Sequence, residues 1–231
     1  MDFLAEGFRR ALALLFSGDA EVYGIALLTL RVAIVATVVS CAIGLPLGYL
    51  LATRRFWGRR AALTVVNTAL AFPTVVVGLL LYGVLSRRGP LGGLGWLYTW
   101  QAIVVGDVLL ALPIAAALSA AAVQGVDARV RRTAETLGAG RWLTAWTVAR
   151  EARFALAAVI TAAFGQVVAE IGAAMIVGGN VRGSTRTLTT AVALYTSQGD
   201  FGLALALGLV LIATALLVNV ALQVLQGKGS G

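Results

Sequence analysis

Two carboxylic acids lie within or near long apolar runs of the chain, where a charged side chain is costly. Asp107 lies in the run 101–123, and Glu170 lies deeper in another run, between Gly165 and Gly172. Hydrocarbon solvates charge poorly, so both acids are functional candidates. For Asp107 we expect a structural role close to a solvated outer interface. For Glu170 we favour a structural or gating ion pair with an arginine over contact with a substrate, because a bare carboxylate would repel an anion.

A second group of candidates is rich in hydrogen-bond donors. The segment Gly178–Thr187 combines glycine amides, two guanidinium groups and several hydroxyls. Such donors can hold a tetrahedral oxyanion at the mouth of a pore. A solvated outer loop that contacts a partner protein explains the same composition. The path or gate candidates are Glu170, Gly178, Gly179 and Asn180, and the candidates for anion or partner-protein contact at an outer mouth are Arg182, Ser184 and Arg186.

The side chains that enzymes use most often are missing. The sequence has no histidine, and its one cysteine, Cys41, lies inside an apolar run as a small packing residue. Thiolate zinc sites, disulfide scaffolds and histidine acid–base chemistry are therefore excluded. A GxxxxGK[ST] phosphate-binding loop is also absent. We predict a chain that is not an enzyme and binds no metal or cofactor, with any ATP and magnesium on a separate subunit.

The composition indicates a membrane protein. Hydrophobic residues make up 60% of the sequence and charged residues 12%, which is unlike a soluble domain. The length suffices for about five or six membrane-spanning helices of about 20 residues each. The net charge of +8 comes almost wholly from arginine. The positive-inside rule explains this charge better than nucleic-acid binding, because no basic stretch lies on a soluble domain.

The hydropathy pattern predicts a transmembrane domain over 21–226 in an all-α fold. An amphipathic helix over 1–20 is expected to lie in the membrane interface, with an ordinary surface helix as the alternative. Residues 227–231 resemble a flexible tail. Pro46, Pro73 and Pro113 lie inside spans and should bend them. The predicted spans are 25–52, 61–86, 101–123, 154–177 and 201–225.

The arginine distribution predicts the orientation. The loop after the first span and the polar segment 124–153 after the third carry most of the arginines, and both fall on one side of five alternating spans. That side should be cytoplasmic, which leaves the amino terminus outside and the carboxyl terminus inside. The chain is thus expected to cross the cell (plasma or inner) membrane several times.

The polar segment 124–153 carries the strongest positive signal. Its apolar residues recur at helical spacing, and Gly138 and Gly140 interrupt them. This pattern predicts a short helix, a glycine turn and a second helix, with an apolar face that can seat in a groove on a partner. The alternative is a helix that lies on lipid headgroups.

Part of this segment resembles the EAA loop of membrane subunits of bacterial ABC importers. In Arg132–Trp142, Gly138 matches the glycine of the motif and Ala134 its second alanine, whereas Thr133 and Arg132 replace the first alanine and the leading glutamate. The resemblance implies a cytoplasmic coupling helix that docks on an ATPase subunit. The residues that it assigns to coupling are Arg132, Thr133, Ala134, Glu135, Leu137, Gly138 and Ala139.

A second resemblance is narrower. Ala169–Asn180 and Thr185–Ala191 resemble oxyanion permeases, most of all those for tungstate uptake and somewhat less those for molybdate. It implies the five-transmembrane-helix core of the smaller, type I ABC importers. Two copies would form one pathway that works by alternating access, with two cytoplasmic ATPase subunits and an extracytoplasmic oxyanion-binding protein.

Other substrates and other classes stay open at this point. Molybdate and sulfate are alternative substrates, and tungstate and molybdate have nearly the same size and charge. A passive channel or an ion-coupled carrier without an ATPase partner is the alternative from a different class, and a membrane anchor or assembly scaffold is a third.

Overall fold

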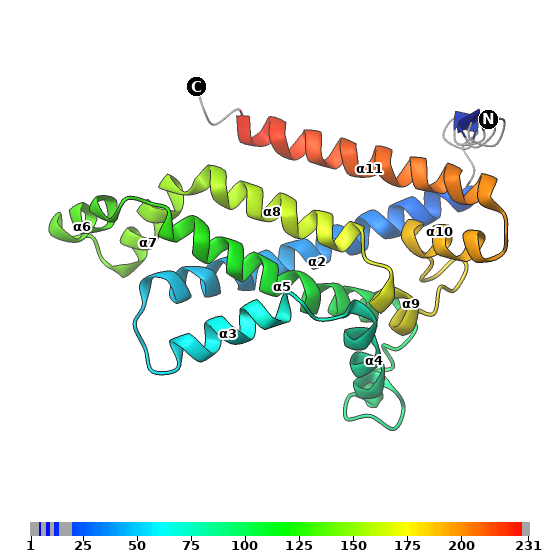
Figure 1. Cartoon of the computed structure of the whole chain (residues 1–231), viewed down its shortest axis with the longest axis horizontal. Coiled ribbons are helices and arrows are strands. Elements are labelled where there is room, and N and C mark those ends of the chain that lie inside the picture. Colours follow the sequence, from blue (N-terminus) through cyan, green and yellow to red (C-terminus); the bar gives the residue numbers. More distant parts are fainter. Residues whose placement is uncertain (1–4, 6–7, 10–11, 14–19, 228–231) are drawn as a thin grey trace.

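The described part of the chain is built from helices. The computed structural model describes residues 5, 8–9, 12–13 and 20–227, and most of the expected interfacial helix and of the tail lie outside these residues. Figure 1 shows the arrangement. The elements are α2 (Ala20–Thr53), α3 (Arg59–Ala69), α4 (Thr74–Leu85), the 3₁₀ turn η1 (Gly92–Leu94), α5 (Trp100–Gln124), α6 (Ala128–Thr136), α7 (Arg141–Glu151), α8 (Arg153–Val168), α9 (Gly172–Gly178), α10 (Leu188–Ser197) and α11 (Phe201–Gly227).

Long apolar helices confirm the all-helical membrane fold class. Among the described residues, α2, α5 and α11 are each long and apolar enough to cross a membrane. The number rises to five if each of two bent pairs, α3–α4 and α7–α8, counts as one span. Large apolar side chains of α11 face outward, among them Ile212, Leu216 and Leu217, as is expected of a surface that contacts lipid or another protein.

The close pairing of α2 and α5 forms the centre of the fold. A Cβ atom on Gly44 would lie 2.6 Å from the Ala115 Cβ, and one on Gly48 would lie 2.5 Å from the Ala116 carbonyl oxygen. The two backbones approach so closely because small residues face each other. Cys41 is buried beside Ala115, which confirms the expected packing role.

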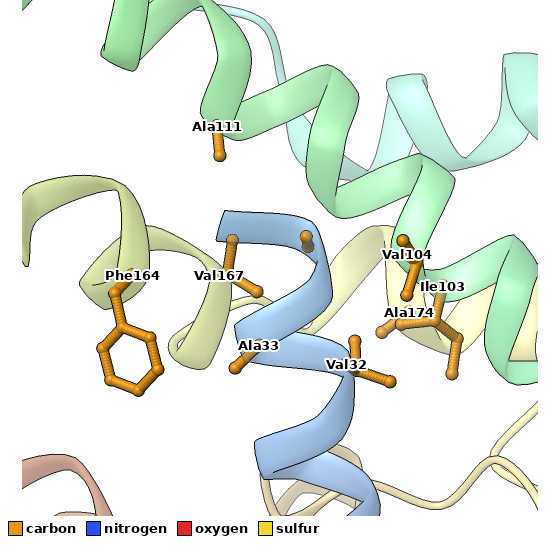
Figure 2. Packing of buried hydrophobic residues seen from close by; sticks show 9 residues of the cluster. Val32, Ala33, Ile103, Val104, Ala111, Phe164, Val167 and Ala174 are labelled. Carbon is orange, nitrogen blue, oxygen red and sulfur yellow. The ribbon is translucent and has the colours of Figure 1, made fainter. Parts of the chain in front are cut away.

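A larger apolar cluster joins α2 and α5 to α8 and α9. Val32 and Ala33 of α2 pack with Ile103 and Val104 of α5, and Phe164 of α8 closes the cluster. In the view of Figure 2, Phe164 lies on one side of α2, and Ile103 and Val104 lie on the other. The core therefore includes α5, which contains Asp107, and α8 and α9, which flank Glu170 in the sequence.

The span predicted over 61–86 is two helices instead of one. Helices α3 and α4 meet at 105°. Pro73 has no N–H for a helical bond to the preceding turn, and its carbonyl instead begins α4 by accepting from the amides of Val76 and Val77. After this break α4 packs on α9, where a Cβ on Gly78 would lie 2.8 Å from the Ala173 Cα.

The span predicted over 154–177 is also interrupted. Helix α8 ends at Val168 and α9 begins at Gly172, so Glu170 lies in the break between them. A Cβ on Gly172 would lie 2.5 Å from the Thr74 hydroxyl oxygen, which ties this break to the start of α4. At its other end α8 meets α7 at 76°. Helix α7, in the polar segment 124–153, therefore bends sharply away from the axis of α8.

A further helix follows the donor-rich segment Gly178–Thr187, where no membrane span was predicted. Helix α10 (Leu188–Ser197) begins with a capping box in which Thr187 and Thr190 exchange side-chain and backbone hydrogen bonds. Leu188 and Ala191 are fully buried and pack with Val22 and Leu207. Four threonines at the end of that segment and the start of α10 are buried, namely Thr185, Thr187, Thr189 and Thr190.

Candidate functional site

Helices α6 and α7 form the predicted helix–turn–helix. Helix α6 is capped at its start by Asp127, whose carboxylate accepts from the Arg129 amide at 2.8 Å. It ends in a turn where the amides of Gly138 and Ala139 donate to the carbonyls of Glu135 and Ala134. Gly138 has a φ of 84°, in the left-handed region that favours glycine.

A cleft of about 600 Å³ opens between α6 and α7. Its lining is mostly apolar, yet Leu137 is 81% exposed and Leu143 58%. An apolar, open cleft of this kind is suited to receive a partner helix or loop. Of the seven predicted coupling residues, five line the cleft: Thr133, Ala134, Leu137, Gly138 and Ala139.

The other two coupling residues lie differently. Arg132 is exposed and does not line the cleft. Glu135 faces the opposite direction, toward a cavity of about 160 Å³ beside the end of α2. There its carboxylate accepts from Arg131 Nε at 2.9 Å, and the same guanidinium donates to the Thr53 carbonyl at 3.3 Å. Arg131 was not among the predicted coupling residues, yet it attaches α6 to α2.

The two acids lie in the interior and line one small cavity. Asp107 is 3% exposed and Glu170 6%, and both line a cavity of about 10 Å³. The expectation of a solvated Asp107 is therefore wrong. Glu170 accepts from the Ala173 amide at 2.8 Å. No arginine of the described residues lies within ion-pair distance of Glu170, so the expected ion pair does not form among them.

The three gate candidates after Glu170 shape the turn between α9 and α10. The Gly178 carbonyl accepts from the Thr185 hydroxyl at 2.5 Å. Gly179 has a φ of 69°, and a Cβ there would lie 2.7 Å from the ring of Tyr98. Asn180 also has a positive φ, 49°, and its amide group both donates to and accepts from Thr190. These contacts fix the backbone next to the break.

The outer-mouth candidates gather around one carboxylate. Arg182 donates to Glu21 through two nitrogens, with the Nε contact at 2.7 Å. A nitrogen of Arg186 lies 3.8 Å from the same carboxylate, and its guanidinium lies 6.0 Å from the ring centre of Tyr195. Ser184 is exposed. The two guanidinium groups are thus brought together at the start of α2.

Comparison with known proteins gives consistent matches. Residues 44–228 match the family described as binding-protein-dependent transport system inner membrane component. The tungstate uptake system permease protein of Peptoclostridium acidaminophilum is 37% identical over 226 residues, which cover 98% of this chain and 99% of that protein.

Two further relatives agree with this match. The tungstate uptake system permease protein of Campylobacter jejuni is 41% identical over 95% of this chain and 92% of its own length. A probable anion ABC transporter permease protein of Haloferax volcanii is 39% identical, with 83% and 84% covered.

Proposed function

The chain belongs to the family of binding-protein-dependent transport system inner membrane components, and we propose that it is the permease subunit of an ATP-driven tungstate importer. The observation that carries the proposal is the open cleft at the EAA-like loop, on a chain whose long apolar helices embed it in the membrane. Tungstate as the substrate is supported by the two near-full-length relatives that are named for its uptake.

The proposed assembly contains two copies of this chain, each with the five-transmembrane-helix core of a type I importer. One cytoplasmic ATPase subunit docks on each coupling loop and holds ATP and magnesium, and a binding protein outside delivers the oxyanion. The exposed apolar faces of α4 and α11 support burial against lipid and a second copy, because large side chains such as Leu80 and Leu217 are 67% and 71% exposed.

The proposed orientation places α6 and α7 in the cytoplasm. In Figure 1 these helices lie at one end of the molecule, whereas α9 and α10 lie at the other. Arg54, Arg131 and Arg141 gather at the end with α6 and α7, which supports a cytoplasmic location by the positive-inside rule. The outer mouth would then lie near Arg182 and Arg186, with the amino terminus outside and the carboxyl terminus inside.

The proposed mechanism is alternating access driven by movement of the coupling loops. When the ATPase pair closes on ATP, α6 is drawn with it, and Arg131 transmits the movement to α2 through the Thr53 carbonyl. Helix α2 is packed tightly against α5, so the two should move as a rigid unit. The breaks at 70–73 and 169–171 are the places where the path can bend open.

Replacement of Leu137 by aspartate tests the docking role. Its side chain is 81% exposed at the cleft, so Leu137→Asp should leave the fold intact and place an unpaired charge in the interface. We expect the variant permease to lose the ATPase subunit during co-purification. Ala128→Asp is the matched control, because Ala128 is exposed at the start of α6, the helix that precedes Leu137, and does not line the cleft.

Equal retention of the ATPase subunit by both variants would remove the docking role. Failure of the wild-type permease to co-purify with any ATP-hydrolysing subunit would favour the passive channel or ion-coupled carrier. Molybdate and sulfate remain alternative substrates, and competition with tungstate in the same uptake assay separates them.

A further inference from the structure

Two carboxyl groups share a cavity that contains no basic side chain. Asp107 comes from the first half of α5, and Glu170 comes from the break between α8 and α9. Both line the cavity of about 10 Å³, together with three threonines and several apolar residues. A space of this size holds about one water molecule at most.

The two acids have unequal hydrogen bonding. Glu170 Oε1 accepts from the Ala173 amide at 2.8 Å, which stabilises a negative charge on this side chain. Asp107 Oδ1 is fully buried and has no hydrogen-bond partner among the described residues. An ionised carboxylate in that position would cost several kcal/mol. Protonation of Asp107 removes this cost, because the neutral acid carries no buried charge.

Arg31 and Arg186 are engaged with other side chains. Arg31 of α2 lies over the ring of Trp100, 4.0 Å from its centre. Arg186, next to the cavity-lining Thr187, lies beside Glu21 and Tyr195. Neither arginine lines the cavity, so no basic side chain of the described residues that line it compensates two negative charges there.

An inorganic cation fits the cavity poorly. Hard cations take about six or more oxygen ligands, and the threonine oxygens already have partners. The Thr29 hydroxyl donates to the Ile25 carbonyl at 2.8 Å and accepts from the Leu188 amide at 2.9 Å. The Thr189 hydroxyl donates to the Glu170 carbonyl at 2.9 Å. A proton needs no such shell.

We propose that Asp107 and Glu170 form a proton-binding site, in which one carboxylic acid is hydrogen-bonded to the other carboxylate, directly or through one water. The proton comes from solvent, forms one O–H bond and leaves the pair with one negative charge instead of two. This site goes beyond the transport function, because nothing in the coupling loop or the outer mouth requires it.

The site is placed where protonation can act on the conformation. Helix α9 packs on α5 beside the break, with Ala174 against the cluster that contains Ile103. Loss of the shared proton would leave two like charges facing each other in an apolar interior, which repel strongly. Protonation therefore favours the packed arrangement of α5 and α9, and alkaline pH loosens it.

Infrared spectroscopy of the full-length permease in lipid nanodiscs tests the proposal directly. One sample carries ¹³C in the aspartate side-chain carboxyls, and another carries it in the glutamate carboxyls. We expect a carboxylic-acid C=O band at neutral pH that shifts with at least one of the labels and is lost at alkaline pH. Solvent-exposed acids are ionised at neutral pH and give no such band.

Substitutions assign the band to the pair. Asp107→Asn should abolish it, whereas Asp127→Asn, at an exposed helix cap, should leave it unchanged. Absence of an acid band at neutral pH in both labelled wild-type samples would overturn the proposal, and this result requires no variant to fold. Loss of the band on addition of sodium or potassium would also overturn it, in favour of a metal-cation site. Neither readout involves tungstate uptake, so a failed transport assay would not affect the outcome.

Discussion

Two glycines, two residues apart between α6 and α7, have different backbone requirements. Gly138 has a φ of 84°, in the left-handed region, whereas Gly140 has a φ of −65° that any residue adopts. A Cβ atom at either position would meet nothing within 4 Å. Substitutions at the two positions therefore differ in backbone strain and not in contacts within the chain.

Gly138→Ala should weaken the coupling of ATP hydrolysis to tungstate uptake, whereas Gly140→Ala should not. A left-handed conformation costs an alanine about 1–2 kcal/mol, so the turn that presents Leu137 would be populated less in the first variant. We expect more ATP hydrolysed per tungstate taken up by proteoliposomes that contain Gly138→Ala. The Gly140→Ala ratio should stay close to wild type, and equal ratios for the two variants would contradict a role for this turn.

The pair formed by α2 and α5 links the coupling end to the buried acids. Gly44 and Gly48 allow the approach, and Ser119 of α5 donates to the Leu45 carbonyl at 3.1 Å. Helix α2 ends at Thr53, whose carbonyl accepts from Arg131 of α6. A change in the α2–α5 contact should therefore affect stability and coupling together.

Gly48→Ala should destabilise the permease. The added methyl group would lie 2.5 Å from the Ala116 carbonyl oxygen and 2.7 Å from the Ser119 Cβ, and such overpacking costs about 1–3 kcal/mol. We expect a lower unfolding temperature in detergent. Gly24→Ala, in the same helix but with open space around it, should unfold at the wild-type temperature, and identical midpoints would show that the helices are not tightly packed.

Hydropathy was sufficient to predict the long helices. It did not predict the breaks inside the spans expected over 61–86 and 154–177. Helices α2, α5 and α11 follow from uninterrupted apolar runs. The runs around Pro73 and Glu170 are also apolar, so no drop in hydropathy marks either break. The proline and the acid themselves were the features of these runs that could have indicated the breaks. Helix α10 was not predicted because its threonines make this stretch polar. In the structure the hydroxyls of Thr189 and Thr190 form hydrogen bonds with that of Thr187 in the interior.

The candidate site was predictable where it depends on local sequence. The glycine turn of the coupling loop follows from a short motif around Gly138. The attachment of Arg131 to Thr53 joins residues 78 apart in the sequence, and Asp107 and Glu170 meet only because α5 packs against the break before α9. Contacts of this kind depend on tertiary packing, which one sequence does not reveal.

The single chain leaves large apolar surfaces and an apolar cleft uncovered. Side chains such as Leu79, Leu137 and Leu217 are all more than 60% exposed, whereas most of the apolar area of a stable protein is buried against protein or lipid. These surfaces indicate a subunit of a larger membrane assembly. We expect the ATPase subunit to transmit its movement at the cleft, and the anion to enter at the opposite end of the molecule.

The most direct test is tungstate uptake by the permease, ATPase subunit and binding protein reconstituted in proteoliposomes. We predict accumulation that requires ATP inside and the ATPase subunit, with tungstate stimulating ATP hydrolysis more than molybdate or sulfate does. Tungstate entry that proceeds equally without ATP or the ATPase subunit would contradict the proposed function.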